Sequence, residues 1–355
     1  MYSEVYKQRP SYADFDSPAK VQAITSIIAR RLTEYPNAIC SYSGGSDSDI
    51  MLDMIERARG AFNLPPVKYV FFDTGLEMAA TKRHVAEQSA RYGVTIETAR
   101  PKKNIVLAVR DHGIPFMSKI VSSGFEQIQA KGLPLSIADE YAGAADKAAK
   151  REELRQRYPK SESGINFLCG CNSRGEPRPE IQLVIGANKF LLDFIRENPI
   201  PFQCSNKCCT YCKKNVAHAA QKTFDMVITG ERRDEGGMRS VPRSGDKNSA
   251  MCFTETADGK YRFRPLFYMS DADKAWYKEY YGLRYSDAYE VYGLKRTGCC
   301  GCSISASATA DLEKIKAFEP NLVKAAWHVF GPSYEYRQKY NAYKAKRMGE
   351  RRQDE

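Results

Sequence analysis

Apolar residues follow two kinds of spacing along the chain. From residues 17 to 35 they recur every three or four positions, which predicts an amphipathic helix. Short continuous apolar runs at 38–42 and 67–72, each followed by a glycine-containing turn and a new helical pattern, predict buried strands, and 94–98 and 224–229 fit two more. Strands that alternate with helices predict an α/β fold, a doubly wound and mostly parallel sheet with helices on both faces.

The middle and the end of the chain have a different pattern. Residues 130–160 are rich in Ala, Lys, Glu and Arg without a wide apolar stripe, which predicts a charged helix within a helical insertion at about 120–200. Apolar positions from Leu312 to Val329, with Phe318 among them, predict packed helices, and 337–352 reads as a basic exposed end. We therefore expect three parts: an N-terminal helical segment (1–36), a central α/β domain that carries the insertion (37–300), and C-terminal helices with a basic tail (301–355).

Composition narrows the class of protein. The 355 residues are 43% hydrophobic and 27% charged, which is typical of globular proteins and excludes disordered, collagen-like and repeat architectures. A net charge of +11 attracts polyanions, but it does not distinguish nucleic acid from nucleotide phosphates. The chain has no apolar run of about 18 residues and no signal-peptide pattern at its start, so we expect a cytoplasmic protein with no membrane partner.

A glycine-rich turn joins the first predicted strand to the next helix. It reads Ser43, Gly44, Gly45, Ser46, Asp47, Ser48. Glycines let backbone N–H groups approach an oxyanion, and the start of the helix adds positive potential. The turn is therefore a candidate phosphate site, although the same residue types also form ordinary turns and helix caps.

This turn is the first of six motifs that resemble one protein family in order. The family is the phosphoadenosine phosphosulfate (PAPS) reductase-like branch of the adenine nucleotide α-hydrolase superfamily, whose PP-loop reads S-G-G-x-D-S. The other five similar segments are Asp73-Thr74-Gly75-Leu76-Glu77, 113–119, 205–214, 229–239 and 296–302. The resemblance spans about residues 38 to 330 and implies a PP-loop fold that binds an adenine nucleotide, either ATP or a sulfonucleotide (APS or PAPS).

The resemblance also implies roles for individual residues. Asp47 is a candidate Mg²⁺ contact when the ligand is ATP, because Mg²⁺ prefers one or two carboxylates together with phosphate oxygens. Four basic residues would close over the anion as a positive clamp: Lys119, Arg232, Arg233 and Arg239. The expected nucleotide-binding set is Ser43, Gly44, Gly45, Ser46, Asp47, Ser48, Asp73, Thr74, Gly75, Gly230 and Glu235.

Nine of the eleven cysteines crowd into two stretches of the sequence, and such clustering suggests a metal. Four thiolates suit a [4Fe–4S] cluster, and structural zinc is the alternative. The ligands that the resemblance implies are Cys208, Cys209, Cys299 and Cys302, with Cys212 and Cys300 as possible substitutes. Cys169 and Cys171 specify nothing on their own.

The reaction is not decided by the motifs alone. Assimilatory reductases of the family need a catalytic cysteine in a C-terminal E-C-G-L-H segment, and no cysteine follows Cys302 here. We therefore expect an ATP pyrophosphatase-type activation coupled to sulfur transfer, with a possible nucleic-acid substrate and a possible sulfur-donor or electron-donor protein as partner. The alternatives are an APS/PAPS reductase that forms sulfite, and a non-catalytic nucleotide-binding protein with a redox or nucleic-acid-binding role.

Overall fold

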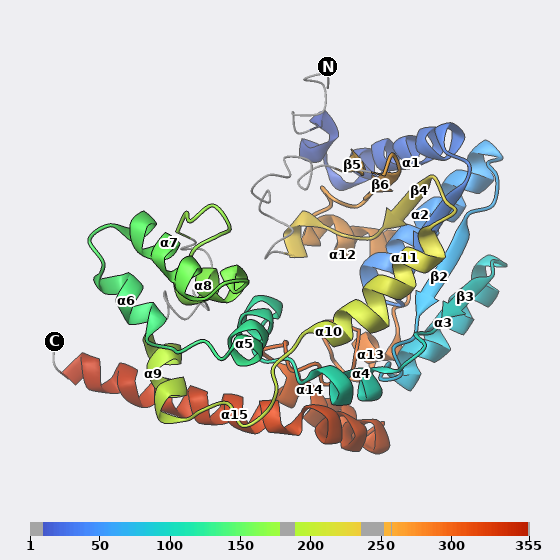
Figure 1. The fold of residues 1–355 in the computed structure, drawn as a ribbon. Helices are drawn as coiled ribbons and strands as arrows, with labels where there is room; N and C mark the ends of the chain where they lie inside the picture. Colours follow the sequence, from blue (N-terminus) through green and yellow to red (C-terminus); the bar gives the residue numbers. More distant parts are fainter. Residues whose placement is uncertain (1–9, 178–188, 236–251, 257, 354–355) are drawn as a thin grey trace. The chain divides into compact units, whose positions relative to one another are not determined.

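The computed structural model describes residues 10–177, 189–235, 252–256 and 258–353, and these residues form two compact units (Figure 1). Unit 1 consists of Met1–Pro101 and Lys213–Cys299, and unit 2 of Lys102–Cys212 and Cys300–Glu355.

Unit 1 is built on a six-stranded sheet in the order β3-β2-β1-β4-β6-β5. All neighbouring strands are parallel except β5 and β6, which confirms the mostly parallel sheet predicted from the sequence. The strands are β1 (Ala38–Ser41), β2 (Lys68–Phe72), β3 (Ile96–Ala99), β4 (Met226–Thr229), β5 (Phe253–Glu255) and β6 (Tyr261–Phe263). The sequence patterns predicted β1 to β4 but missed β5 and β6, because three residues are too few to establish an alternating pattern.

The helices of unit 1 follow from their caps and apolar faces. The Asp16 carboxylate accepts a hydrogen bond from the Ala19 N–H at 3.0 Å, and Ile24 and Ile28 bury the inner face of the first helix. This helix was predicted to within one residue. The helical segments of unit 1 are η2 (Ser11–Asp14), α1 (Ser17–Glu34), α2 (Ser46–Phe62), α3 (Ala79–Tyr92), α11 (Asn215–Gln221), η5 (Arg233–Glu235), α12 (Asp271–Tyr280) and α13 (Asp287–Glu290).

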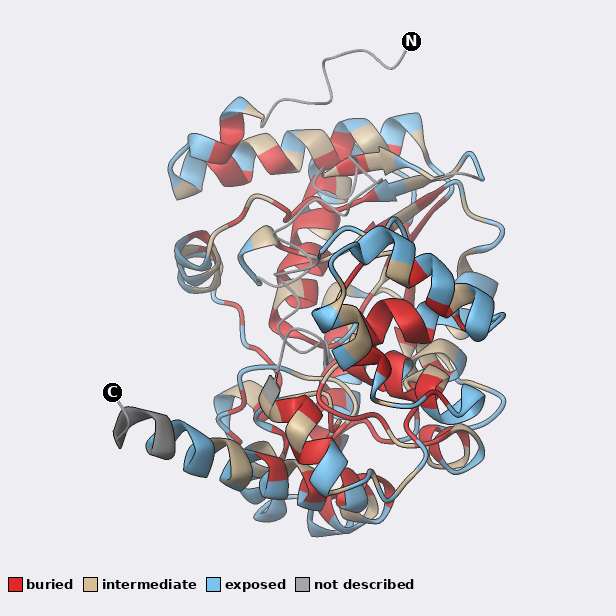
Figure 2. Ribbon diagram, turned by 60° about the vertical axis from the view of Figure 1, so that its left-hand side comes forward, coloured by how far each residue is buried: buried red, intermediate tan, exposed pale blue. Residues whose placement is uncertain are grey.

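The strand order reverses at the centre of this sheet. From β1 the chain builds outward through β2 and β3, and it later returns beside β1 with β4 before adding β6 and β5. Ile39 pairs with Val227 of β4 on one side and Lys68 of β2 on the other, and the central strand is buried (Figure 2). In open α/β sheets, ligands bind at the carboxyl ends of the strands where the order reverses. This topology therefore points to the region beyond β1 and β4.

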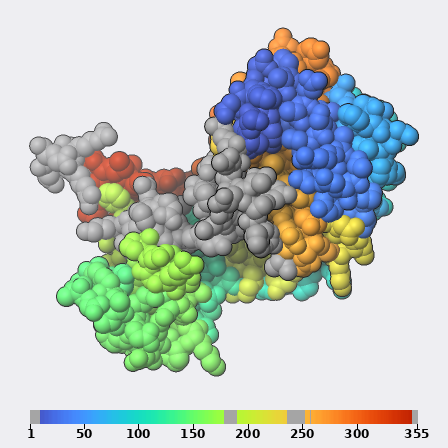
Figure 3. All heavy atoms as spheres, turned by 90° about the horizontal axis from the view of Figure 1, so that it is seen from above, coloured from blue at the N-terminus to red at the C-terminus, as the bar shows by residue number. Residues whose placement is uncertain are grey.

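Unit 2 is helical throughout the part that the structure describes. Its helices are α4 (Ile105–His112), α5 (Lys119–Lys131), α6 (Ile137–Gly143), α7 (Lys147–Arg157), α8 (Glu162–Leu168), α9 (Lys189–Glu197), α10 (Lys207–Cys209), α14 (Ala308–Lys316) and α15 (Pro320–Gln353), and a π-helical turn, η4 (Thr210–Lys214), crosses into unit 1. Helices α5 to α8 form the green group of atoms in Figure 3. The prediction of one charged helix over 130–160 was wrong, because Gly132 ends α5 in a left-handed conformation and a second break separates α6 from α7.

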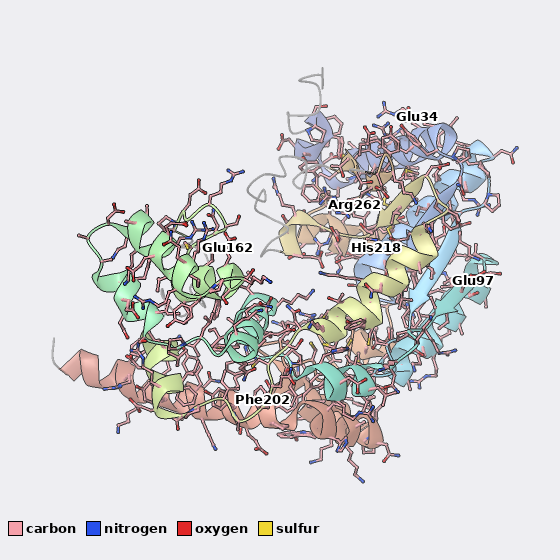
Figure 4. All side chains as sticks on the ribbon, in the orientation of Figure 1. Glu34, Glu97, Glu162, Phe202, His218 and Arg262 are labelled. Atoms are coloured by element: carbon pink, nitrogen blue, oxygen red, sulfur yellow. The ribbon has the colours of Figure 1, made fainter. Side chains whose placement is uncertain are left out.

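The C-terminal segment is a single 34-residue helix, α15. Tyr336 and Tyr340 are buried, and their rings lie 5.1 and 5.4 Å from the ring of Phe194 on α9. Phe202, labelled in Figure 4, meets Tyr336 edge-on at 5.9 Å. Phe318 is 47% exposed rather than packed, because it follows the end of α14. None of the helices described is long and apolar enough to cross a membrane.

Candidate functional site

Unit 1 contains a pocket of about 800 Å³ at the carboxyl ends of β1, β2 and β4. The loop between β1 and α2 forms one wall, and the segment from Thr229 to Glu235 after β4 forms another. Asp271 and Lys274 from the first turn of α12, and residues 295–298, complete the lining. The pocket thus lies at the position where the reversal of strand order predicts a ligand site.

Glycines shape the loop between β1 and α2. Gly44 has φ +66°, a conformation that L side chains rarely adopt. A Cβ at Gly44 would lie 2.8 Å from the Thr81 methyl group, and one at Gly45 would lie 3.0 Å from the Thr297 hydroxyl oxygen. Gly44 therefore requires glycine for this loop to keep its shape, whereas a side chain at Gly45 would require the Thr297 hydroxyl to shift.

The Ser48 hydroxyl braces the same loop from inside. It accepts a hydrogen bond from the Gly45 N–H at 3.0 Å and donates one to the Gly45 carbonyl at 2.7 Å. The hydroxyls of Ser43 and Ser48 are 3.0 Å apart. The Ser46 N–H donates to the Tyr289 hydroxyl at 3.4 Å. Ser43, Gly45 and Ser48 thus form one hydrogen-bonded turn at the start of α2, and Ser46 ties it to Tyr289.

Two cations from different elements bind one carboxylate oxygen of Asp47. The Arg232 Nε donates to Asp47 Oδ1 at 2.9 Å, and the Lys274 ammonium lies 2.8 Å from the same atom. Lys274 also donates to the Ser46 hydroxyl at 2.5 Å. Charge-assisted hydrogen bonds therefore join the loop between β1 and α2 to the segment after β4 and to the first turn of α12.

Arg232 is only 4% exposed, yet it keeps its charge. Burial lowers the pKa of its guanidinium, but Asp47 and Asp271 outweigh burial and raise that pKa above its ordinary value. The guanidinium donates to Asp271 Oδ1 at 2.8 Å and to the Met269 carbonyl at 3.2 Å. A fixed positive charge thus lines the pocket.

Gly230 and Glu235 lie at the same wall as Arg232. A Cβ at Gly230 would lie 3.2 Å from the Asp47 carbonyl oxygen, so glycine lets β4 approach the loop closely. The Glu235 carboxylate accepts a hydrogen bond from the Arg232 backbone N–H at 3.1 Å. Glu235 therefore holds the backbone of Arg232.

Asp73, Thr74 and Gly75 form a separate turn after β2 and are not among the residues that line the pocket. Asp73 accepts hydrogen bonds from the Gly75 N–H at 3.0 Å and from Arg100 at 3.3 Å. Burial opposes ionisation of Asp73, but these bonds and Lys82 lower its pKa below the ordinary value. Thr74 donates to Glu77 at 2.9 Å, and Glu77 is the member of this segment that reaches the pocket.

The other members of the expected clamp have different surroundings. Lys119 begins α5 in unit 2, where its carbonyl accepts a hydrogen bond from the Asn206 amide at 2.6 Å. The Arg233 guanidinium lies 5.8 Å from the centre of the Tyr268 ring and is not part of the pocket lining. Arg239 lies outside the described residues. Of the four basic residues, Arg232 is the one that the described structure brings to the loop.

Sequence reasoning missed Lys274 and Asp271, which belong to no family motif. Ser270 and Asp273 form a reciprocal pair of hydrogen bonds at the start of α12, and this Ser-x-x-Asp spacing was available as a helix-start signal. The signal locates a helix terminus in the sequence. It does not predict which strands have their carboxyl ends beside that terminus.

The candidate metal ligands are divided between the two units. Cys208, Cys209 and Cys302 belong to unit 2, together with the substitutes Cys212 and Cys300, whereas Cys299 belongs to unit 1. The Cys299 thiol lies 3.4 Å from the Thr74 hydroxyl and donates to Glu77 at 3.8 Å. Across the residues that the structure describes, no three Cys, His, Asp or Glu side chains are grouped as a metal site. The ligand set therefore stays a prediction.

Residues 37–162 match the family model of the phosphoadenosine phosphosulfate reductase domain. Over these residues the match agrees with the family resemblance found in the sequence, and it includes the loop at residues 43–48 and the turn at residues 73–75. No curated protein matches the chain.

Several solved structures resemble the chain at low identity. The phosphoadenylyl-sulfate reductase of Candida auris, in a phosphate complex, is 16% identical, with 82% of this chain and 96% of that chain covered and a TM-score of 0.39. The U34-tRNA thiolase NcsA of Methanococcus maripaludis, with its [4Fe-4S] cluster, is 11% identical over 96% of this chain and 84% of that chain, with a TM-score of 0.35. An NH3-dependent NAD synthetase of Campylobacter jejuni is 11% identical over 91% and 96%, with a TM-score of 0.34.

Proposed function

We propose that the pocket of unit 1 binds ATP with Mg²⁺ and activates an acceptor by breaking the bond between the α- and β-phosphates, with pyrophosphate as the leaving group. The observation that carries this proposal is the convergence of Arg232 and Lys274 on Asp47, at the start of α2, within a pocket lined by the glycine-rich loop. The family match over residues 37–162 supports an enzyme that binds an adenine nucleotide. Coupling of this activation to sulfur transfer belongs to the same proposal.

The charges of the pocket favour a nucleotide that arrives with a divalent cation. Among the described residues, the carboxylates that line it are Asp47, Glu77, Glu231, Asp234, Glu235 and Asp271, and the cations are Lys213, Arg232, Lys274, Lys295 and Arg296. A polyanion that enters without a metal would be repelled by the carboxylates. The oxygen donors of Asp47 and Asp271 suit Mg²⁺, which would neutralise part of the phosphate charge when bound.

The chain's own residues then have distinct tasks. The phosphates are held at the start of α2 by backbone N–H groups of residues 43–48 other than those of Ser43, Gly45 and Ser46, which already donate to side-chain hydroxyls. Arg232 and Lys274 stabilise the negative charge that develops on the departing pyrophosphate, because both are fixed in place before the reaction. Asp47 keeps the two cations together, so that little reorganisation is needed when the nucleotide binds.

The second candidate is an APS/PAPS reductase that forms sulfite, and the name of the matching family model favours it. The two candidates differ in their products. The purified protein is offered ATP with Mg²⁺, APS and PAPS in parallel under anaerobic conditions, and pyrophosphate and sulfite are measured. Pyrophosphate from ATP supports the proposal, whereas sulfite from either sulfonucleotide supports the reductase. Binding without any product would indicate the non-catalytic alternative.

The sharpest variant is Lys274→Met, because this lysine belongs to no family motif. Removal of a charge-assisted hydrogen bond to phosphate should lower nucleotide turnover about 10- to 100-fold. Lys278→Met is the matched control, since Lys278 lies one turn further along α12, pairs with Glu290 at 2.7 Å and is not part of the pocket lining. Equal activity of the two variants would count against the assignment of Lys274.

The iron–sulfur cluster is tested separately. Protein prepared without oxygen should contain about four iron atoms and four inorganic sulfides per chain if the cluster is present. Cys209→Ser and Cys302→Ser should then lose iron, whereas Cys40→Ser, on a buried strand, should keep it. Zinc without iron in such a preparation would support the alternative metal. The activation proposed for the pocket requires neither iron nor zinc.

A further inference from the structure

Three hydroxyl groups gather over the backbone of Gly45, which caps the start of α2 in unit 1. A Cβ at Gly45 would lie 3.0 Å from the Thr297 hydroxyl oxygen, 3.2 Å from the Tyr289 hydroxyl oxygen and 3.2 Å from the Ser43 hydroxyl oxygen. All four residues line the pocket. Because Gly45 has no side chain, hydroxyls from a distant segment of the chain can approach the phosphate loop closely.

A short helix and the turn after it hold Tyr289 and Thr297 beside each other. The Tyr289 N–H, on α13, donates to the Ser286 carbonyl at 2.8 Å. The carbonyl of the fully buried Ala288 accepts a hydrogen bond from the Leu294 N–H at 3.0 Å, which folds the chain back between the two residues. The hydroxyl oxygens of Tyr289 and Thr297 are 3.4 Å apart. The fold of this segment therefore fixes both hydroxyls at the loop.

The hydrogen bonds of these two hydroxyls leave one proton unused. The Tyr289 oxygen accepts the Ser46 N–H at 3.4 Å. Each hydroxyl carries a single proton, and only one of the two protons can lie between Tyr289 and Thr297. Among the described residues, neither hydroxyl has another acceptor within hydrogen-bond distance. At least one proton is therefore available to an acceptor that enters the pocket.

The surroundings of these hydroxyls favour an anionic acceptor. The Lys274 ammonium donates to the Ser46 hydroxyl at 2.5 Å, and Ser46 is also the residue whose N–H Tyr289 accepts. Lys274 pairs with Asp47 as well, so its charge is shared with one carboxylate. The start of the 17-residue helix α2 adds positive potential at the same place. A hydroxyl that donates to an ionised oxygen forms a stronger hydrogen bond than one that donates to a neutral oxygen.

We propose that the Tyr289 hydroxyl donates a hydrogen bond to a phosphate oxygen of the bound nucleotide while it still accepts the Ser46 N–H, and that the Thr297 hydroxyl assists it. Tyr289 then adds a donor at a point of the loop where the backbone N–H is already used. The inference rests on the proposed function, because it requires that phosphates enter this pocket. Tyr289 lies outside the six segments that resemble the family.

Tyr285 offers a matched control four residues earlier in the chain. Its ring lies 6.0 Å from the Tyr289 ring, but it is only 7% exposed and does not line the pocket. Its hydroxyl has no hydrogen-bond partner among the described residues. Phenylalanine at this position keeps the ring, whose centre is 5.7 Å from the Lys274 ammonium. Tyr285→Phe therefore removes a neighbouring phenol that the phosphates do not contact.

Calorimetric titration with three probes in the presence of Mg²⁺ separates a phosphate contact from a change in the shape of the pocket. The probes are ATP, inorganic pyrophosphate and adenosine. Tyr289→Phe should weaken the binding of ATP and pyrophosphate about five- to tenfold, as expected for one hydrogen bond, and leave adenosine unaffected because it has no phosphate. Tyr285→Phe should bind all three probes like the unaltered protein. Unchanged affinities of Tyr289→Phe for ATP and pyrophosphate, or an equal loss for all three probes, would overturn the inference.

Thr297 gives a second test that does not depend on how Tyr289→Phe folds. Thr297→Val removes the hydroxyl and should weaken the binding of pyrophosphate, whereas Thr297→Ser keeps the hydroxyl and should bind it as the unaltered protein does. Equal affinities of these two variants would contradict the role of the hydroxyl. If the unaltered protein binds neither ATP nor pyrophosphate, the proposed function fails together with this inference. If it binds both and neither Tyr289→Phe nor Thr297→Val weakens that binding, the inference alone fails.

Discussion

Arg232 and Asp47 are 185 positions apart in the sequence, and the Arg232 Nε donates to Asp47 Oδ1 at 2.9 Å. The pair joins the segment after β4 to the first turn of α2. Since β1 and β4 are neighbours in the sheet, their carboxyl ends bring the two residues together. The ion pair is therefore both a part of the candidate site and a contact that holds its two walls in place.

This pairing gives Asp47→Ala two separate effects. Nucleotide turnover should fall to background, because the carboxylate that positions Arg232 and Lys274 is removed. The free energy of unfolding should also fall by about 1–3 kcal/mol, because the buried Arg232 guanidinium loses one of the three partners that it has among the described residues and keeps Asp271 and the Met269 carbonyl. Urea unfolding of the variant measures the second effect.

A double variant distinguishes the loss of the ion pair from other damage. Arg232→Met added to Asp47→Ala removes the charge that was left with fewer partners, so it should regain part of the lost stability without regaining turnover. If Asp47→Ala unfolds at the same urea concentration as the unaltered protein, the ion pair has no structural role.

Gly44 offers a test of the loop that does not depend on charge. Gly44→Ala must place a side chain at φ +66° and 2.8 Å from the Thr81 methyl group. We expect a decrease of at least about 1 kcal/mol in stability and weaker nucleotide binding, because the loop must shift. Thermal unfolding and ATP titration measure the two effects.

Gly60→Ala is the matched control within the same strand–helix unit. Gly60 lies inside α2 and a Cβ there has no neighbour within 4 Å, so the substitution should stabilise the protein by about 0.5–1 kcal/mol. Thr81→Ser, which removes the opposing methyl group, should recover part of the stability that Gly44→Ala removes. Wild-type stability and binding in Gly44→Ala would show that the loop tolerates a different shape.

The parts of the site that are local in sequence were predictable. Residues 43–48 form one turn, and glycine and serine are needed there for reasons of backbone geometry that the sequence already contains. Arg232 was predictable because it follows a strand whose carboxyl end lies at the same edge as this turn. Both predictions rest on short-range chemistry and on a rule about parallel sheets.

The parts that depend on packing were not predictable. Lys274 reaches Asp47 because α12 packs against both α1 and α2, and no periodic pattern reports which helices become neighbours. Tyr340 was assigned to the basic exposed end at 337–352 because basic residues surround it in sequence, although its ring faces Phe194. The mixture of buried rings and exposed charges on one helix conceals which face is the core.

The ion pair between Lys20 and Asp273 makes the stability of unit 1 depend on pH in the acid range. The Lys20 ammonium lies 2.6 Å from Asp273 Oδ2, and both side chains are buried. Burial raises the pKa of Asp273, but hydrogen bonds from Lys20, Ser17 and Ser270 outweigh it and lower the pKa to about 2. A carboxylate with a lowered pKa stabilises the fold above its unfolded pKa, and this contribution, about 2 kcal/mol, is lost as the pH falls from about 4 to 2.

The variant Asp273→Asn should lose this stability at neutral pH and show a flatter acid transition than the unaltered protein. Fluorescence or circular dichroism between about pH 7 and 2 records the transition. Asp258→Asn is the control, because Asp258 is exposed and its hydrogen bond with Thr256 joins residues of one turn. A transition in Asp273→Asn that coincides with the unaltered one would contradict the linkage.

The end of α15 is the candidate surface for a nucleic-acid substrate. After Tyr343 the sequence contains five basic residues, Lys344, Lys346, Arg347, Arg351 and Arg352, and three acidic ones, Glu350, Asp354 and Glu355, a net charge of +2. Truncation after Tyr343 keeps the buried Tyr336 and Tyr340, and the Tyr343 hydroxyl that donates to Glu197 at 3.0 Å. The truncated protein should therefore remain folded.

If this end binds phosphates, truncation should weaken binding to RNA or DNA and make the dependence on salt shallower, by about 0.7–0.9 in the logarithmic slope for each phosphate that is no longer neutralised. Fluorescence anisotropy at several salt concentrations measures the slope. The variant Lys314→Gln/Lys316→Gln on α14 removes the same net charge of +2 from another exposed part of unit 2 and should leave the slope unchanged. The affinity for ATP should stay constant, because the truncation lies outside unit 1. An unchanged salt slope in the truncated protein would show that the end of α15 takes no part in binding nucleic acid.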